Sequence, residues 1–303
     1  MNARIIESYS ALVNRKDIDA VLVLSEGWAG CLPILAAAEA GKAVYWASDM
    51  NWDVDTRNHI RNVVERSGIA FMIEFPNRFA AASIRLKELM ATRLGPPRLI
   101  FCHKRIPFSA VEGKGKPSGA GCSRGHGTDN LYFEMAQLVD WCNFIAGGEP
   151  SSVMSIGHER RPELADEQNT DADYRLVSLD FSHFDGDRKQ PGPLAQLSVG
   201  AYYPQGWEEA LSYRPLPAMQ VCCERGIAYL DLPSSLVWFD DSGRHQERLD
   251  DEKPAIHHAL MHFFRAVTSL VRQSDDIRQS YLVMEILEAA KKSRRSAHTV
   301  HIE

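Results

Sequence analysis

The chain has 303 residues, of which 45% are hydrophobic and 24% are charged. This composition is close to that of an average soluble globular protein, so it excludes a largely disordered chain or a coiled coil. The length allows two domains, each with its own core. The net charge of −6 argues against a broad nucleic-acid-binding surface, because such a surface needs a basic excess.

The cysteines show no C-x-x-C spacing, and Cys222 and Cys223 are adjacent. We therefore expect free thiols in a reducing compartment and no zinc site. No apolar run reaches the roughly 18 residues that a membrane-spanning helix needs. Residues 1–21 lack the long apolar core of a secretory signal, so the sequence predicts a cytoplasmic protein.

Residues 17–50 have the pattern of a βαβ unit. Apolar runs at 21–24 and 43–46 flank an Ala/Leu-rich helical segment that ends at Gly41, as buried parallel strands around a helix would. Such a unit holds ligands at the carboxyl ends of its strands, which here are residues 25–28 and 47–49. A helix at residues 5–15 precedes it.

The alternation continues as far as residue 102. We expect a helix at 54–67, a strand at 69–75, a helix at 79–93 and a strand at 98–102, which predicts a parallel α/β sheet. Residues 109–129 are rich in Gly, Lys and Ser. Their glycine spacing fits neither G-x-G-x-x-G nor the Walker loop, so we expect a loop and no phosphate site there.

The second half has a different pattern. After a helix at 131–146, helical periodicity gives way to short strands separated by turn residues, which predicts an antiparallel sheet. The strands are expected at 153–156, 174–181, 194–201, 219–223, 227–232 and 236–239. Helices that begin at 254 and at 277, and a strand at 299–302, complete the chain.

The predicted fold class is therefore α/β plus α+β, with a partial Rossmann-type parallel sheet followed by a mostly antiparallel-sheet domain. We place the first domain at residues 1–106 and the second at 107–276. The segment 277–303 is expected to pack between the domains or back onto them.

The order of these motifs resembles the Gfo/Idh/MocA family of oxidoreductases. The resemblance rests on Asp19-Ala20-Val21 through Ala40-Gly41-Lys42, on Asn77-Arg78-Phe79, on Asp140 with Gly148-Glu149-Pro150 behind it, and on Glu288-Ala289-Ala290 with Ser293. It implies a domain that binds NAD or NADP and a hydride transfer to or from a small sugar-like substrate or polyol. The net charge and the lack of a long apolar run predict no nucleic-acid and no membrane partner, and the resemblance suggests a homo-oligomer formed through the C-terminal sheet.

The chain departs from this family at several positions. Family members open with a strand and a Gly-rich turn that binds the pyrophosphate, whereas the first strand here corresponds to a later one, so we expect a truncated Rossmann domain. Ser48 stands where the family has its active-site lysine, and Gln137 stands where it has a histidine. A glutamine cannot exchange a proton near neutral pH. Of that motif, only the acid Asp140 remains.

The resemblance nevertheless implies a set of site residues. The expected residues are Ser25, Glu26, Trp28 and Ser48 for the cofactor, Gln137 and Asp140 for catalysis, and Arg78 for the substrate, with no metal. Alternatives remain open for several of them. Gln137 and Asp140 could be polar residues at a domain junction, and Arg78 could pair within its own domain.

Two further candidates have weaker support. Glu134 is a substitute acid for the lost relay. His258 and His262 have the i, i+4 spacing of two metal ligands, but we expect them to face solvent.

Three functions are compatible with this pattern. The first is an NAD(P)-dependent oxidoreductase, impaired by the missing Gly-rich loop and the lost lysine and histidine. The second is a non-catalytic sugar-binding protein, and the third is a structural subunit that oligomerises through its second sheet.

Overall fold

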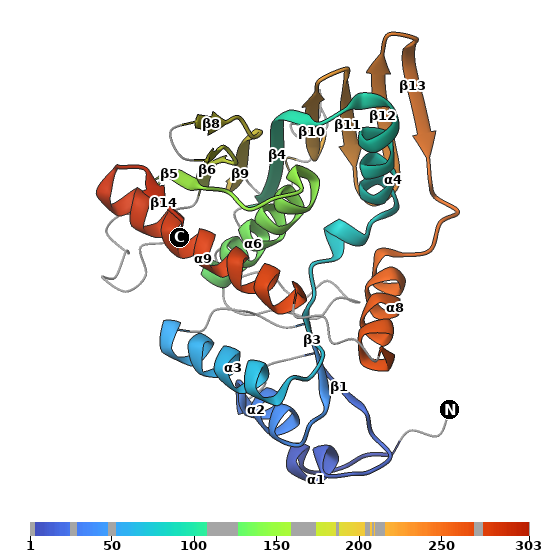
Figure 1. Cartoon of the computed structure of the whole chain (residues 1–303), viewed down its shortest axis with the longest axis vertical. Helices are drawn as coiled ribbons and strands as arrows, with labels where there is room; N and C mark the ends of the chain where they lie inside the picture. The colour runs from blue at the N-terminus through green and yellow to red at the C-terminus, as the bar shows by residue number, and fades with distance from the viewer. Residues whose placement is uncertain are drawn as a thin grey trace. The chain divides into compact units, whose positions relative to one another are not determined.

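A computed structural model describes residues 4–24, 29–47, 53–107, 127–158, 174–185, 188–203, 207, 209, 216–269 and 275–302. The chain divides into two compact units. One comprises Met1–Glu74 with Ile256–Tyr281, and the other comprises Phe75–Ala255 with Leu282–Glu303. Figure 1 shows the helices and strands of both units.

Unit 1 contains the parallel sheet that the sequence predicted. Its described strands are β1 (Ala20–Val23), β2 (Ala43–Trp46) and β3 (Phe71–Ile73), in the order β1-β2-β3. Its helices are α1 (Tyr9–Val13), α2 (Leu32–Glu39), α3 (Val54–Ser67) and α8 (Ala255–Thr268). Every residue of β2 and β3 is buried, as expected for a sheet that is covered on both faces.

Capping residues set the limits of the helix between β2 and β3. Asp53 accepts a hydrogen bond from the Thr56 amide at the start of α3, and Gly68 ends this helix in the left-handed conformation with φ of 59°. Both are the residue types that these positions favour. Helix α1 is shorter than predicted, because it covers less than half of residues 5–15.

Unit 2 is built on a large sheet. Among the described residues, nine strands lie in the order β13-β12-β11-β10-β4-β9-β6-β5-β14. Their bounds are β4 Pro97–Pro107, β5 Ser152–His158, β6 Tyr174–Asp180, β9 Leu194–Tyr203, β10 Met219–Cys223, β11 Gly226–Asp231, β12 Ser235–Asp240, β13 Gly243–Arg248 and β14 Val300–His301. Neighbours are antiparallel except β4 and β9, which are parallel. A separate hairpin joins β7 (His183–Asp185) to β8 (Arg188–Gln190).

The position of β4 corrects one sequence prediction. Helix–strand alternation predicted that residues 98–102 form a fourth strand of the parallel sheet, but β4 pairs with β9 and β10 in the large sheet. It is also twice as long as predicted, and alternate residues such as Ile100 and Cys102 are buried. A strand with one exposed face suits a mostly antiparallel sheet.

The helices of unit 2 differ from the predictions mainly at their ends. The helix predicted at 79–93 is three pieces: the 3-10 turn η2 (Pro76–Phe79), α4 (Ala81–Leu89) and the π-turn η3 (Met90–Leu94). Helix α6 (Gly127–Ala146) packs on β4 and β9, and α9 (Asp275–Ser296) extends further at both ends than residues 277–292 (Figure 1). No described helix is both long and apolar enough to cross a membrane.

Helix α6 is buried around most of its circumference. The predicted apolar face, which includes Met135, Cys142 and Ile145, is buried, but so are Gln137, Asp140 and Trp141 on other faces. A polar residue in such a position needs a polar partner.

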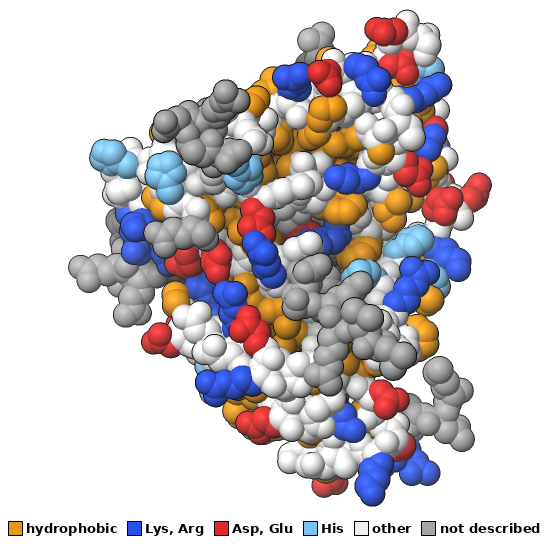
Figure 2. All heavy atoms as spheres, viewed as in Figure 1, with side chains coloured by type: hydrophobic (Ala, Val, Ile, Leu, Met, Phe, Trp, Pro, Cys, Tyr) orange, Lys and Arg blue, Asp and Glu red, His pale blue; other side chains and the backbone are white. Residues whose placement is uncertain are grey.

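The cysteines, the surface charges and two histidines of α8 were also subjects of sequence predictions. The five described cysteines form no disulfide, as the sequence predicted. On the face shown in Figure 2, basic and acidic side chains of the described residues are interspersed. His258 and His262 are half-buried rather than exposed, because α8 buries the stripe through Ala259 and Phe263 and leaves Ile256 and Leu260 partly in solvent.

Candidate functional site

The predicted cofactor residues cannot be placed. Ser25, Glu26, Trp28 and Ser48 all lie outside the described residues. The three other predicted site residues, Arg78, Gln137 and Asp140, are described and all belong to unit 2.

Arg78 and Asp140 form a two-point ion pair. Nε of Arg78 donates to Oδ2 of Asp140 at 2.8 Å, and Nη2 donates to Oδ1. The Asp140 side chain has no exposed surface, and the Arg78 side chain is 14% exposed. The guanidinium also lies over the Phe75 ring, 5.9 Å from its centre. This fork geometry holds both side chains in one orientation.

A second set of contacts attaches η2 to α6. Trp141 Nε1 donates to the Ser83 hydroxyl at 2.8 Å, and that hydroxyl donates to the Asn77 carbonyl at 2.7 Å. Ser83 and Trp141 are both buried. Two consecutive residues of α6, Asp140 and Trp141, thus fix two consecutive residues of η2, Arg78 directly and Asn77 through Ser83.

Gln137 lies one helical turn before Asp140 and is 4% exposed. Positions i and i+3 share a helix face, so α6 presents an amide and a carboxylate on the same side. Glu134 forms an ion pair with Lys104 of β4 at 3.6 Å.

The cluster of Arg78, Asp140 and Gln137 is suited to a fixed conformation and not to proton exchange. Protonating Asp140 would leave a largely buried guanidinium without its carboxylate, which is energetically costly. Gln137 can donate and accept hydrogen bonds but cannot exchange a proton near neutral pH.

Unit 1 brings together a second pair, which the sequence did not reveal. The hydroxyl of Tyr45 on β2 donates to Oε1 of Glu74, directly after β3, at 3.2 Å. The Phe263 ring packs edge-on against Tyr45, with the ring centres 5.4 Å apart. Burial first, and then the charge of Glu74, raise the pKa of Tyr45 far above its ordinary value. The signal in the sequence was the single charged residue of the run 69–75.

A Ser–His–Asp group on the turn between β12 and β13 is not a catalytic triad. The same imidazole nitrogen, Nε2 of His245, lies 3.0 Å from both Ser242 Oγ and Asp240 Oδ1, whereas a triad uses the two ring nitrogens separately. Hydrogen bonds from Ser242, and then from His245, lower the pKa of Asp240 to about 2. These contacts stabilise the turn.

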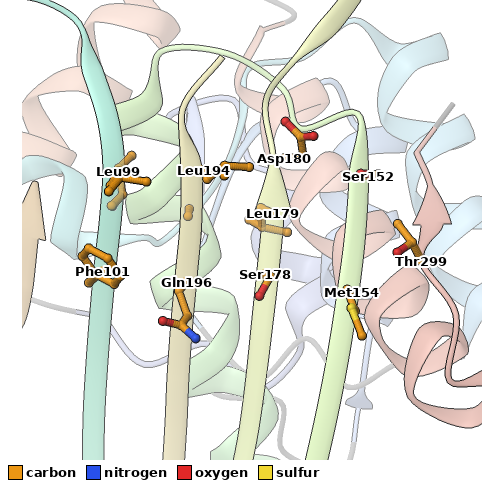
Figure 3. Close-up of a pocket in the computed structure, with 12 residues that line it drawn as sticks. Leu99, Phe101, Ser152, Met154, Ser178, Leu179, Asp180, Leu194, Gln196 and Thr299 are labelled. Carbon is orange, nitrogen blue, oxygen red and sulfur yellow. The ribbon is translucent and has the colours of Figure 1, made fainter. Parts of the chain in front are cut away.

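The outer face of the large sheet carries a shallow hollow of about 370 Å³. Leu99, Phe101, Leu194 and Met154 line it, together with small polar side chains such as Ser178 (Figure 3). The strand register aligns Leu99 with Leu194 and Ser178 with Met154 across neighbouring strands, so the hollow runs over β4, β9, β6 and β5.

Solved structures match this architecture over nearly the whole chain. An NAD-binding oxidoreductase from Klebsiella pneumoniae superposes with a TM-score of 0.73 at 15% identity, over 98% of this chain and 83% of that one. Myo-inositol 2-dehydrogenase from Lactobacillus plantarum gives a TM-score of 0.67 at 15% identity, over 98% and 84%. The chain has the Gfo/Idh/MocA fold. The resemblance in the sequence is confirmed at the level of the fold.

Sequence comparison gives a more local match. Inositol 2-dehydrogenase 3 of Saccharopolyspora erythraea is 32% identical over 109 residues. That match covers 35% of this chain and only 32% of that protein's length. No protein-family model matches the chain.

The amino-terminal ends of α2 and α3 are the described places in unit 1 where the phosphates of a dinucleotide could bind. Helix α2 follows β1 and has no acidic residue in its first turn, so no described side chain there repels a phosphate. Asp53 already caps the start of α3, which closes that helix end to an anion. Among the described residues, the first turn of α2 therefore presents no carboxylate that would oppose an anion, and the 303 residues contain no G-x-G-x-x-G.

Proposed function

We propose that the protein is an oxidoreductase that moves a hydride between NAD or NADP and a hydroxyl or carbonyl group of a sugar or polyol. The observation that carries this proposal is the fold, which matches an NAD-binding oxidoreductase and a myo-inositol 2-dehydrogenase over 98% of the chain. The local match to an inositol 2-dehydrogenase favours a cyclic polyol. The nicotinamide, when bound, supplies the hydride chemistry.

Each side chain has a proposed role. The Gln137 amide hydrogen-bonds the substrate, and Asp140 orients Arg78, which binds a substrate oxygen. Ser25, Glu26, Trp28 and Ser48 are proposed to hold the cofactor. The ion pair of Arg78 and Asp140 supports this division, because a fixed guanidinium is a preorganised donor.

A non-catalytic sugar-binding protein is the second candidate. It is favoured by Gln137, which cannot carry a proton, and by the engagement of Asp140 with Arg78. The two candidates differ in turnover, since only the first predicts it.

The test is cofactor binding followed by turnover. We expect NADH or NADPH to raise the melting temperature of the purified chain, and myo-inositol with the oxidised cofactor to produce absorbance at the reduced nicotinamide band. ADP-ribose is the matched control, since it retains the pyrophosphate and lacks the nicotinamide. Sugar binding without turnover would support the second candidate, and no cofactor binding at millimolar concentration would contradict the first.

We also propose that a second copy of the chain covers the outer face of the large sheet. Six partly exposed apolar side chains lie on this face: Leu99, Met154, Ile156, Leu194, Ile227 and Phe239. Two such faces can pack against each other at about 10 Å. These exposed apolar side chains support the proposal, because large exposed apolar patches are typical of association surfaces.

Leu194→Arg is expected to separate the copies. It lies in the hollow and is 51% exposed, so the arginine would carry an unpaired charge into the interface. Sedimentation should show twice the chain mass for the wild type and the single mass for the variant. Ile5→Arg, at a side chain that is 98% exposed in unit 1, is the control and should stay associated. A wild type that sediments as a monomer at high concentration would contradict the proposal.

A further inference from the structure

His103 lies on the outer face of the large sheet, which is the face that we propose a second copy covers. In β4 the side chains of Ile100 and Cys102 are buried, so the residues that alternate with them point to the opposite side. Leu99 and Phe101 line the hollow on that side (Figure 3). His103 is the next residue of β4 on the outer face, and its side chain is partly buried.

The strand register places this imidazole in the middle of the sheet. Register partners form a row across β4, β9, β6 and β5, which consists of His103, Ser198, Leu176 and Ile156. Nδ1 of His103 lies 3.0 Å from the Ser198 hydroxyl oxygen, so the ring is held beside β9. Ile156 is 56% exposed and is one of the six apolar side chains of this face. A second copy that covers both the hollow and Ile156 therefore covers His103 as well.

The groups next to this imidazole favour its neutral form. Its neighbours on the two flanking strands are uncharged: Ser198 on β9 and Ala218 beside β10, whose carbonyl accepts from the His103 amide at 2.9 Å. Arg105 occupies the next outer position of β4. Burial, and then the positive charge of Arg105, lower the pKa of His103 below its ordinary value. The ring is therefore uncharged at neutral pH.

Other titratable groups of this face lie further from His103. Cys222 of β10 is the register partner of Leu99, which is two outer positions along β4 from the imidazole. The next groups lie two strands away, roughly 10 Å, and are Tyr174 and Asp180 of β6 and Tyr229 and Asp231 of β11. Among the described residues, therefore, no carboxylate adjoins the imidazole and stabilises its charged form.

We propose that His103 makes the association of two copies sensitive to pH: the copies associate while the imidazole is neutral and separate when it is protonated. This inference rests on the proposed association through the outer face. Contact with a second copy removes the remaining water from the ring, which disfavours the charged form further. The pKa of His103 is then lower in the pair than in the single chain. Association is thus strongest above the pKa of the single chain and weakens as the pH falls below it.

Sedimentation at about pH 7.5 and at about pH 5.5, on either side of the ordinary histidine range, tests the inference. The dissociation constant of the wild-type pair should rise about tenfold or more at the lower pH, because each copy must release a proton to associate. His103→Gln keeps a polar side chain beside Ser198 but has no titrating group, so its dissociation constant should be the same at both pH values. His103→Lys carries a positive charge at both and should sediment as a single chain at both.

His158→Gln is the matched control. This histidine alternates with Ile156 at the end of β5 and is exposed, so the variant should keep the pH dependence of the wild type. Circular dichroism at both pH values establishes that each variant is folded. A pH dependence that persists in His103→Gln, or a wild-type pair that is equally tight at both pH values, would overturn this inference alone. A wild type that is a single chain at both pH values would overturn the proposed association as well.

Discussion

Replacing Asp140 by alanine is expected to lower the free energy of unfolding by about 3–5 kcal/mol. The side chain has no exposed surface and holds the Arg78 guanidinium through two hydrogen bonds. Truncation leaves the arginine, which is 14% exposed, without its counter-ion. Urea denaturation monitored by circular dichroism measures the change.

A double variant separates the charge from the packing. Changing Arg78 to methionine together with Asp140→Ala removes the unpaired charge, so part of the lost stability should return. Glu65→Ala breaks a pair whose side chains are 37% and 48% exposed, and it should cost at most about 0.5 kcal/mol. If Asp140→Ala lowered the free energy of unfolding no more than Glu65→Ala does, the pair of Arg78 and Asp140 would contribute little to stability.

Gly226→Ala should destabilise unit 2 by about 3 kcal/mol, the upper end of the range for overpacking. An added Cβ would lie 2.3 Å from the Phe239 carbonyl oxygen and 2.7 Å from Leu94. The amide of the preceding residue, Arg225, donates to the Leu94 carbonyl at 2.9 Å, so the backbone there has little freedom to move. Thermal and urea denaturation both report the effect.

Gly148→Ala is the matched control for this substitution. Nothing lies within 4 Å of a Cβ at Gly148, and its φ is not in the left-handed region. The change should be within about 0.5 kcal/mol of the wild type. Equal stability of Gly226→Ala and Gly148→Ala would contradict this prediction, because it would show that the backbone can move apart where β11 and β12 approach closely.

The local patterns of unit 1 predicted its structure well. Short apolar runs separated by a helix and a glycine stop predict buried parallel strands, and β1, β2 and β3 are parallel. This works because both faces of such strands are covered and their side chains are uniformly apolar. Alternation and turn residues likewise predicted most strands of the large sheet.

Long-range pairing was the part that local pattern could not predict. Nothing within residues 98–102 shows that β4 joins strands roughly 100 residues later in the chain rather than β3. Strand β13 was missed because its sequence, GRHQER, is polar on both faces, and a strand at the edge of a sheet needs no apolar run.

The candidate site was predicted in part. The sequence singled out Arg78, Gln137 and Asp140, and it left an ion pair as one alternative for Arg78. The pair exists, but its partner lies 62 residues away on α6 and not in the first predicted domain. The contact between Tyr45 and Glu74 could not be predicted, since it depends on the register of β2 and β3.

The two contacts that attach η2 to α6 restrict which substitutions this chain can accept during evolution. Arg78 and Asp140 satisfy each other in a nearly water-free position, so a change at either one is penalised until the other also changes. The same holds for Ser83 and Trp141. We therefore expect descendants of this sequence to exchange these residues in pairs, through intermediates that are poorly folded and seldom persist.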